Sequence, residues 1–167
     1  MTTTIILIAV LISSIITLFI LDTGVNYLMK KKVSVNDKIP LTVHIVKAIV
    51  FISSGILLND LFNSFETLST VLSSSFTGND LLFKSFSYFS IFWVITLLAI
   101  AIINWLSFLM YMLVSKGENL FIEIAKNNLG AVILFCGLLL ALTIAIKTGL
   151  TPILDQLIPY PTLPEYH

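Results

Sequence analysis

Long runs of mostly apolar residues with few charges, separated by more polar stretches, dominate the chain. The first run covers residues 4–29 and the second 41–61. A third run, 85–115, contains no charge, and a fourth includes the uncharged residues 127–146 after a short amphipathic lead-in. About 20 apolar residues in a helix cross the ~30 Å hydrocarbon core of a bilayer. The pattern therefore predicts an all-α, polytopic membrane protein with four transmembrane helices.

These helices group into two hairpins along the sequence. Residues 1–62 are the predicted first hairpin unit and residues 85–149 the second. The stretch 63–84, which carries the serine run 73–75, is predicted to be an extracytoplasmic connection. The proline-rich end, 150–167, is predicted to be an extended extracytoplasmic tail.

The composition excludes several classes of protein. The chain has 167 residues, of which 57% are hydrophobic and 11% charged. Soluble domains are about 45–50% apolar and about 25% charged, so the chain falls outside that class. All nine basic residues are lysines, balanced by nine acidic ones, which argues against nucleic-acid binding. The single cysteine, Cys136, excludes an intrachain disulfide and a cysteine-based metal site, and no metal or cofactor is expected.

The lysines indicate how the helices are oriented. Six lie in or beside the connections between helices one and two and between helices three and four: Lys30, Lys31, Lys32, Lys38, Lys116 and Lys126. The positive-inside rule places these connections in the cytoplasm and both termini on the extracytoplasmic side. The run Lys30–Lys32 should also attract anionic lipid.

Shifting the chain by 82 residues superposes the two predicted hairpins without a gap. Equivalent positions include Asp22 with Asn104, Ala48 with Gly130, and Gly55 with Gly137. Units of two spans insert with equal polarity, so the two would be parallel repeats. Small residues permit close helix approach in lipid. We expect the second and fourth helices to pack along these small residues, within the bundle or between subunits. The alternative is chance scatter of glycine in apolar helices.

The second unit carries Glu123-Ile-Ala-Lys-Asn-Asn-Leu-Gly-Ala-Val, followed by Cys136-Gly137-Leu138-Leu139. With this polar lead-in, asparagine and glycine-containing helix, the chain resembles the bacterial membrane-protein family described as domain of unknown function 350. The first unit departs from that pattern, because Pro40-Leu-Thr-Val-His44 stands at the corresponding place. The resemblance implies an inner-membrane protein of tandem two-helix units without an assigned catalytic site.

A few polar residues within the apolar runs are candidates for chemistry. Asp22 and Lys47 reach similar depths in an antiparallel hairpin, and we expect them to pair, because an unpaired charge at such depth costs several kcal/mol. The pair is either structural or part of proton or ion handling. His44 is interpreted as an interface residue, and Asn104 as a hydrogen-bonding group between helices. The entry 123–128 is interpreted as a solvated or interfacial face.

Two functions from different classes fit these observations. The first is an oligomeric structural or adaptor component of the inner membrane, acting in membrane stress or defence, whose basic loops dock a cytoplasmic protein. The second is an oligomeric ion channel or small transporter with Asp22 and Lys47 in the path. No nucleophile–base set, phosphate-binding loop or pair of carboxylates appears in the sequence, so we expect no enzyme.

Overall fold

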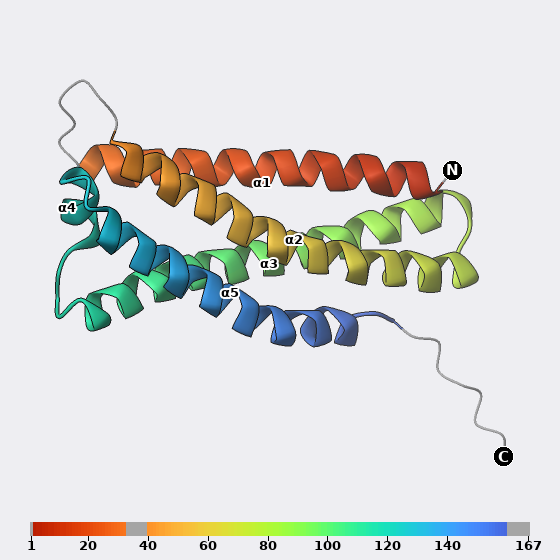
Figure 1. Ribbon diagram of the computed structural model, residues 1–167. Helices are drawn as coiled ribbons and strands as arrows, with labels where there is room; N and C mark the ends of the chain where they lie inside the picture. Colours follow the sequence, from red (N-terminus) through yellow and green to blue (C-terminus); the bar gives the residue numbers. More distant parts are fainter. Residues whose placement is uncertain (1, 33–39, 160–167) are drawn as a thin grey trace, which may run out of the picture.

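The computed structural model describes residues 2–32 and 40–159 and shows an all-α architecture over those residues. Four long helices and one short helix follow in order (Figure 1): α1 (Thr2–Lys32), α2 (Leu41–Ser75), α3 (Gly78–Val114), α4 (Leu120–Ala125) and α5 (Leu129–Gln156). The four long ones are each long and apolar enough to cross a membrane. The predicted fold class is confirmed, and the chain is a multi-pass membrane protein.

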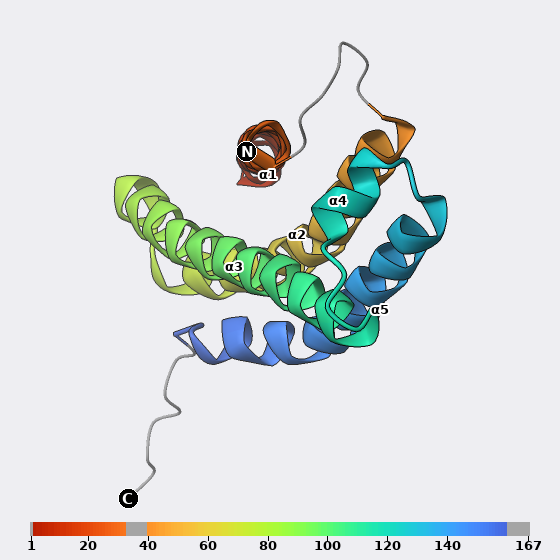
Figure 2. The same ribbon diagram turned by 90° about the vertical axis from the view of Figure 1, so that its left-hand side faces the viewer.

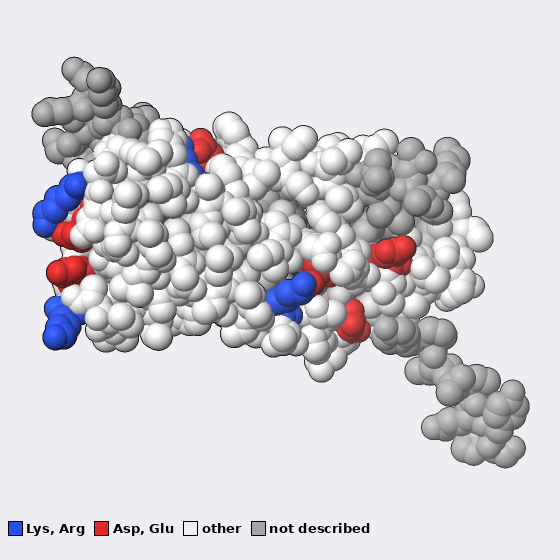
Figure 3. Space-filling model, in the orientation of Figure 1, with Lys and Arg blue, Asp and Glu red and all other residues white. Residues whose placement is uncertain are grey.

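Successive long helices run in opposite directions along one bundle. The end of α1, the starts of α2 and α5, the end of α3 and all of α4 lie at the left of Figure 1. The start of α1 and the end of α5 lie at the right, so α1 is parallel to α3 and α2 is parallel to α5. Exposed Lys116 and Lys126 lie at the α4 end, where Figure 3 shows basic and acidic side chains gathered.

The connection expected over 63–84 is mostly helical, which corrects the element bounds. Helix α2 continues to Ser75 and α3 begins at Gly78, so only Phe76 and Thr77 join them. The serine and threonine side chains in this part of α2 hydrogen-bond to carbonyls of the preceding turn, and buried Leu68 and Leu72 continue the core. Such back-bonding satisfies hydroxyls inside a helix, so a serine run does not require a loop.

The fourth spanning segment is divided, although the sequence suggested one continuous helix from its amphipathic lead-in. Helix α4 ends at Ala125, and Asn127 adopts a left-handed conformation with φ of 56°. The Asn128 N–H bonds to the Glu123 carbonyl (2.9 Å) and the Asn127 N–H to the Ile124 carbonyl (3.0 Å). These two bonds make a Schellman cap, a motif that ends helices and accepts asparagine at its left-handed position.

A new helix starts directly after this cap. The Asn128 side chain accepts hydrogen bonds from the backbone N–H groups of Gly130 and Ala131, which makes it the N-cap of α5. Helix α5 then continues beyond the expected end near Gly149, through Pro152 to Gln156. Pro152 removes one backbone hydrogen bond, but Leu150 and Leu154 on either side are buried in the core. Part of the predicted tail is therefore helix, and residues 160–167 lie outside the described part.

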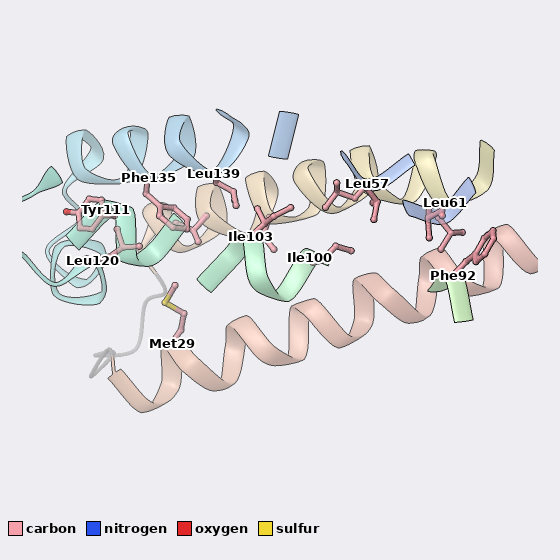
Figure 4. Close-up of a cluster of buried hydrophobic side chains, with 14 of the residues drawn as sticks. Met29, Leu57, Leu61, Phe92, Ile100, Ile103, Tyr111, Leu120, Phe135 and Leu139 are labelled. Atoms are coloured by element: carbon pink, nitrogen blue, oxygen red, sulfur yellow. The ribbon is translucent and has the colours of Figure 1, made fainter. Parts of the chain in front are cut away.

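Helix α2 lies at the centre of the bundle and packs against α1, α3 and α5. Its buried residues recur at steps of three and four, and Figure 4 shows Leu57 and Leu61 in this core, with Leu61 beside Phe92 of α3. Helix α1 packs on one side of the bundle, where Figure 2 shows it end-on beside the other three long helices. Its side facing the bundle carries Met29, which is buried.

Candidate intramembrane polar sites

The structure contains the expected ion pair between the first two helices. Lys47 Nζ lies 2.7 Å from Asp22 Oδ1, and the amide of Asn26 donates to Asp22 Oδ2 at 2.7 Å. Asn26 is one turn beyond Asp22 on α1, so one carboxylate oxygen is satisfied within α1 and the other by Lys47 of α2. Lys47 is about 9 Å along α2 from its first residue at ~1.5 Å per residue. The pair joins α1 to α2 near the α4 end of the bundle.

His44 and Asn104 do not join this pair. His44 is exposed in the first turn of α2. The Asn104 amide donates to the Ile100 carbonyl of its own helix (2.8 Å), so the expected hydrogen bond between helices is replaced by one within α3. Asn104 also lines a cavity of about 440 Å³, whose other lining residues are Val25, Leu28, Met29, Val46, Val50, Ala101, Trp105, Phe108, Leu120, Phe121 and Phe135.

The small-residue faces of α2 and α5 point away from the core. Ala48, Gly55, Gly130 and Gly137 are all exposed, and a Cβ added at Gly55 or Gly137 would meet no atom within 4 Å. The expectation that α2 and α5 pack along these residues within one bundle is therefore wrong. The physical reason is that Val46, Val50 and Leu57 on the opposite face of α2 fill the bundle interior, where alanine and glycine would leave it less completely packed.

Helices α2 and α5 instead meet through another face that includes polar groups. Thr143 Oγ1 lies 3.0 Å from Ser53 Oγ, and both side chains are fully buried. Leu57 and Leu139 are fully buried as well. This α2–α5 interface thus combines apolar packing with a hydroxyl contact, which suits a bilayer because polar contacts help hold helices together there.

A second ion pair lies in the same interface and was missed from the sequence. Lys147 Nζ of α5 lies 3.5 Å from Asp60 Oδ1 of α2, and the Asp60 side chain is 4% exposed. The Ser64 hydroxyl donates to Asp155 Oδ1 at 2.8 Å. Asp60 falls at the end of the predicted second run, 41–61, next to the predicted connection, where a charge needs no partner. Its spacing of four residues from Ser64 was the available signal that both share one helix face.

The segment between α4 and α5 is held by its own polar network. Lys126 Nζ lies 2.7 Å from Glu123 Oε1, and the Asn128 amide donates to Oε2 at 2.7 Å. These hydrogen bonds lower the pKa of Glu123. Thr42 at the start of α2 donates its hydroxyl to the Ile124 carbonyl at 2.9 Å. Of residues 123–128, expected to form a solvated or interfacial face, residues 125–128 are exposed, whereas Glu123 and Ile124 are buried.

These groups can form ion pairs and hydrogen bonds inside an apolar bundle. Within residues 2–32 and 40–159, no three His, Cys, Asp or Glu side chains form a group suited to a metal ion. Lys30, Lys31 and Lys32 end α1, and their side chains lie outside the described part. Comparison with protein-family models, curated proteins and solved structures gives no match to this chain.

Proposed function

We propose that the protein is a homo-oligomeric structural or adaptor component of a bacterial inner membrane, built from two tandem copies of one helical hairpin. The supporting observation is that the glycine faces of α2 and α5 lie on the outside of the bundle with no neighbouring atoms at Gly55 and Gly137. In lipid, such faces permit close backbone approach by another helix. A second copy of the chain offers the same faces and would fill them.

The arrangement of helices supports the duplication. A shift of 82 residues carries the end of α1 at Lys32 onto the end of α3 at Val114, and the end of α2 at Ser75 to within one residue of the end of α5 at Gln156. Buried positions of α2 and α5 correspond under the same shift: Val50 with Val132, Leu57 with Leu139, Leu68 with Leu150, and Leu72 with Leu154. A common ancestral hairpin would keep the same inward face in both copies.

In this proposal the lysine-bearing end of the bundle faces the cytoplasm and docks a protein partner in membrane stress or defence. The exposed side chains Lys116, Glu118 and Lys126 at that end are available for such docking. The positive-inside rule supports this orientation, which places both termini on the other side.

The proposal is tested by measuring the mass of the protein in lipid nanodiscs. We expect the unaltered chain to form an oligomer, and the variant Gly55→Leu/Gly137→Leu to be a monomer, because leucine keeps neighbouring backbones apart. Gly24→Leu is the matched control: Gly24 of α1 also has no atom within 4 Å but lies outside the two glycine faces. A monomeric unaltered chain, or an oligomer unaffected by the double substitution, would contradict the proposal.

Ion conduction through an oligomer is the second candidate, and the polar pairs on span-capable helices favour it. Flux measurements on liposomes containing the purified protein distinguish the two functions. Cation flux that is lost in Asp22→Asn while the oligomer persists would support a path through Asp22 and Lys47. If no flux occurs under any applied gradient, the result favours the adaptor function.

A further inference from the structure

The carboxylate of Asp60 is the most deeply buried charged group described in the structure, and one of its oxygens has no partner. Asp60 is 3% exposed, and its Oδ2 atom accepts no hydrogen bond. Most buried polar atoms in proteins do have a partner, so an isolated carboxylate oxygen requires an explanation. A bare carboxylate oxygen in an apolar interior is unfavourable unless a cation or a proton is bound to it.

The pairing with Lys147 satisfies Asp60 only in part. The separation of 3.5 Å between Lys147 Nζ and Asp60 Oδ1 exceeds the 2.7 Å found for Asp22 and Lys47. Charge-assisted hydrogen bonds between lysine and carboxylate are usually ~2.7–2.9 Å long, so this contact is loose. The Lys147 side chain is 41% exposed, which allows its ammonium group to turn toward the surface.

The other polar groups nearby do not supply the missing positive charge. On α5, Asp155 adds a second negative charge, and its contact is the hydroxyl of Ser64, one turn beyond Asp60 on α2. Figure 3 shows a basic side chain close to acidic ones on this part of the surface, away from the lysine-bearing end. Among the described residues, Lys147 is thus the basic side chain that the structure places in contact with Asp60, and Asp155 adds no positive charge.

The remaining neighbours of this part of α2 are largely apolar. Phe65 of α2 packs against Phe89 of α3 with ring centroids 4.7 Å apart, which fixes the level of α3 beside Asp60. The next buried side chains of α3 are Phe92 and Thr96, neither of which titrates, while Tyr88 is half-buried. On α1, the titratable Asp22 is bound to Lys47, which lies about 20 Å along α2 from Asp60 at ~1.5 Å per residue.

We propose that Asp60 is a proton-binding site within the membrane-spanning bundle, with Lys147 as its displaceable counter-ion. A proton from the aqueous phase forms an O–H bond at Oδ2 as the still-protonated Lys147 turns outward. Release of the proton to water restores the ion pair. A proton fits better than a metal ion, because the described residues bring together too few oxygen ligands here to replace a hydration shell. Asp60 lies about 28 Å along α2 from its start at ~1.5 Å per residue, near the opposite edge of the ~30 Å hydrocarbon core.

Infrared difference spectroscopy of the full-length protein in lipid bilayers tests this site. Lowering the pH from alkaline to mildly acidic should produce the C=O stretching band of a protonated carboxylic acid. The band should disappear in Asp60→Asn and persist in Asp155→Asn and Asp22→Asn. In Lys147→Met it should appear at a higher pH, because the carboxylate has lost its positive partner. Helix content by circular dichroism and elution volume establish which variants fold.

Each result decides for or against the site. A band that persists in folded Asp60→Asn, or that appears at the same pH in Lys147→Met as in the unaltered chain, would overturn the proposal. The Lys147→Met measurement keeps the test valid even if Asp60→Asn does not fold. Suppression of the band by sodium chloride but not by choline chloride would mean that a metal ion occupies the site, and would overturn the assignment to a proton.

Discussion

The two hairpins differ most clearly at one pair of equivalent positions. In the hairpin of α1 and α2, Asp22 and Lys47 form a 2.7 Å ion pair. The positions 82 residues later hold Asn104 and Leu129, which carry no charge. Both charges are thus present in one hairpin and both absent in the other. Losing only one would leave an unpaired charge within a spanning helix, which is costly in hydrocarbon.

The same comparison explains why α1 and α3 are held differently. In the most apolar stretch of α1, 11% of the residues are buried, against 28% in the corresponding stretch of α3. Helix α3 is held by apolar packing on α2 and α5, with Phe92 and Ile103 in the core. Helix α1 depends more on polar contacts, namely the ion pair and the bond from Trp93 Nε1 to Thr17 Oγ1 (2.9 Å). A repeated helix can therefore keep its place through a few polar bonds when its apolar contact is small.

The largest effects are expected where the two hairpins are alike. Leu57→Ala and Leu139→Ala remove equivalent, fully buried side chains of the α2–α5 interface. Each should lower the free energy of unfolding by about 2–4 kcal/mol, because each leaves a cavity. Equilibrium unfolding in mixed micelles, followed by circular dichroism, measures the loss. Leu113→Ala at an exposed site is the control. A large loss for one leucine and none for the other would break the equivalence of the hairpins.

The next effect tests the position where the hairpins differ. Lys47→Leu alone leaves Asp22 without its cation and should destabilise the protein by about 1–3 kcal/mol. Adding Asp22→Asn gives the first hairpin the neutral pair found in the second, and should recover most of that loss. The same unfolding measurement applies. If the destabilisation of the double variant equals the sum of the destabilisations of the two single variants, the two residues do not act as a pair.

The segment between α4 and α5 exists only in the second hairpin. Asn127 is left-handed there, whereas the equivalent Ile45 lies within the continuous helix α2. Asn127→Val should cost about 1–2 kcal/mol, because a β-branched residue fits the left-handed conformation poorly. Asn127→Gly, which accepts this conformation, should cost little. Equal unfolding free energies for the two variants would contradict the role assigned to the Schellman cap.

The smallest effect concerns pH at the same segment. The pKa of Glu123 is lowered by its hydrogen bonds to Lys126 and Asn128. The carboxylate therefore stabilises the fold fully above its ordinary titration range, and this contribution is lost as the pH falls through the lowered pKa. The protection of residues 120–131 against hydrogen exchange, measured relative to the intrinsic amide exchange rate at each pH, should fall on acidification. Glu123→Gln should make this protection less sensitive to pH, and an unchanged pH profile in that variant would argue against Glu123 as the cause.

The helices and one ion pair could be predicted from the sequence for clear reasons. Uncharged runs of bilayer length have few other interpretations, and charges within them need partners, which led from Asp22 to Lys47. The inward face of α2 could not be predicted in the same way. Its small-residue face and its core face share the same helical spacing, and lipid and protein interior are both apolar. The pattern alone therefore does not say which face points inward.

The extension of α2 beyond residue 61 and the break at Asn127 were not predicted, for local reasons. The serines and threonines after Asp60 are typical of loops, but in this helix they bond to their own backbone. Asn127 was assigned to a helix, although the pair Asn127-Asn128 combines a residue that tolerates the left-handed conformation with a good N-cap. A helix end at Asn127 followed by an N-cap at Asn128 is the pattern that predicts this break.

Labelling of single cysteines tests the central claim, two hairpins inserted with the same polarity, most directly. In a Cys136→Ser background, Asp37→Cys and Lys116→Cys place a thiol in each lysine-rich connection, and Thr77→Cys places one between α2 and α3. A membrane-impermeant maleimide is added to sealed vesicles of known orientation. We expect Asp37→Cys and Lys116→Cys to react from the cytoplasmic side and Thr77→Cys from the opposite side. Reaction of Asp37→Cys and Lys116→Cys from opposite sides would contradict it.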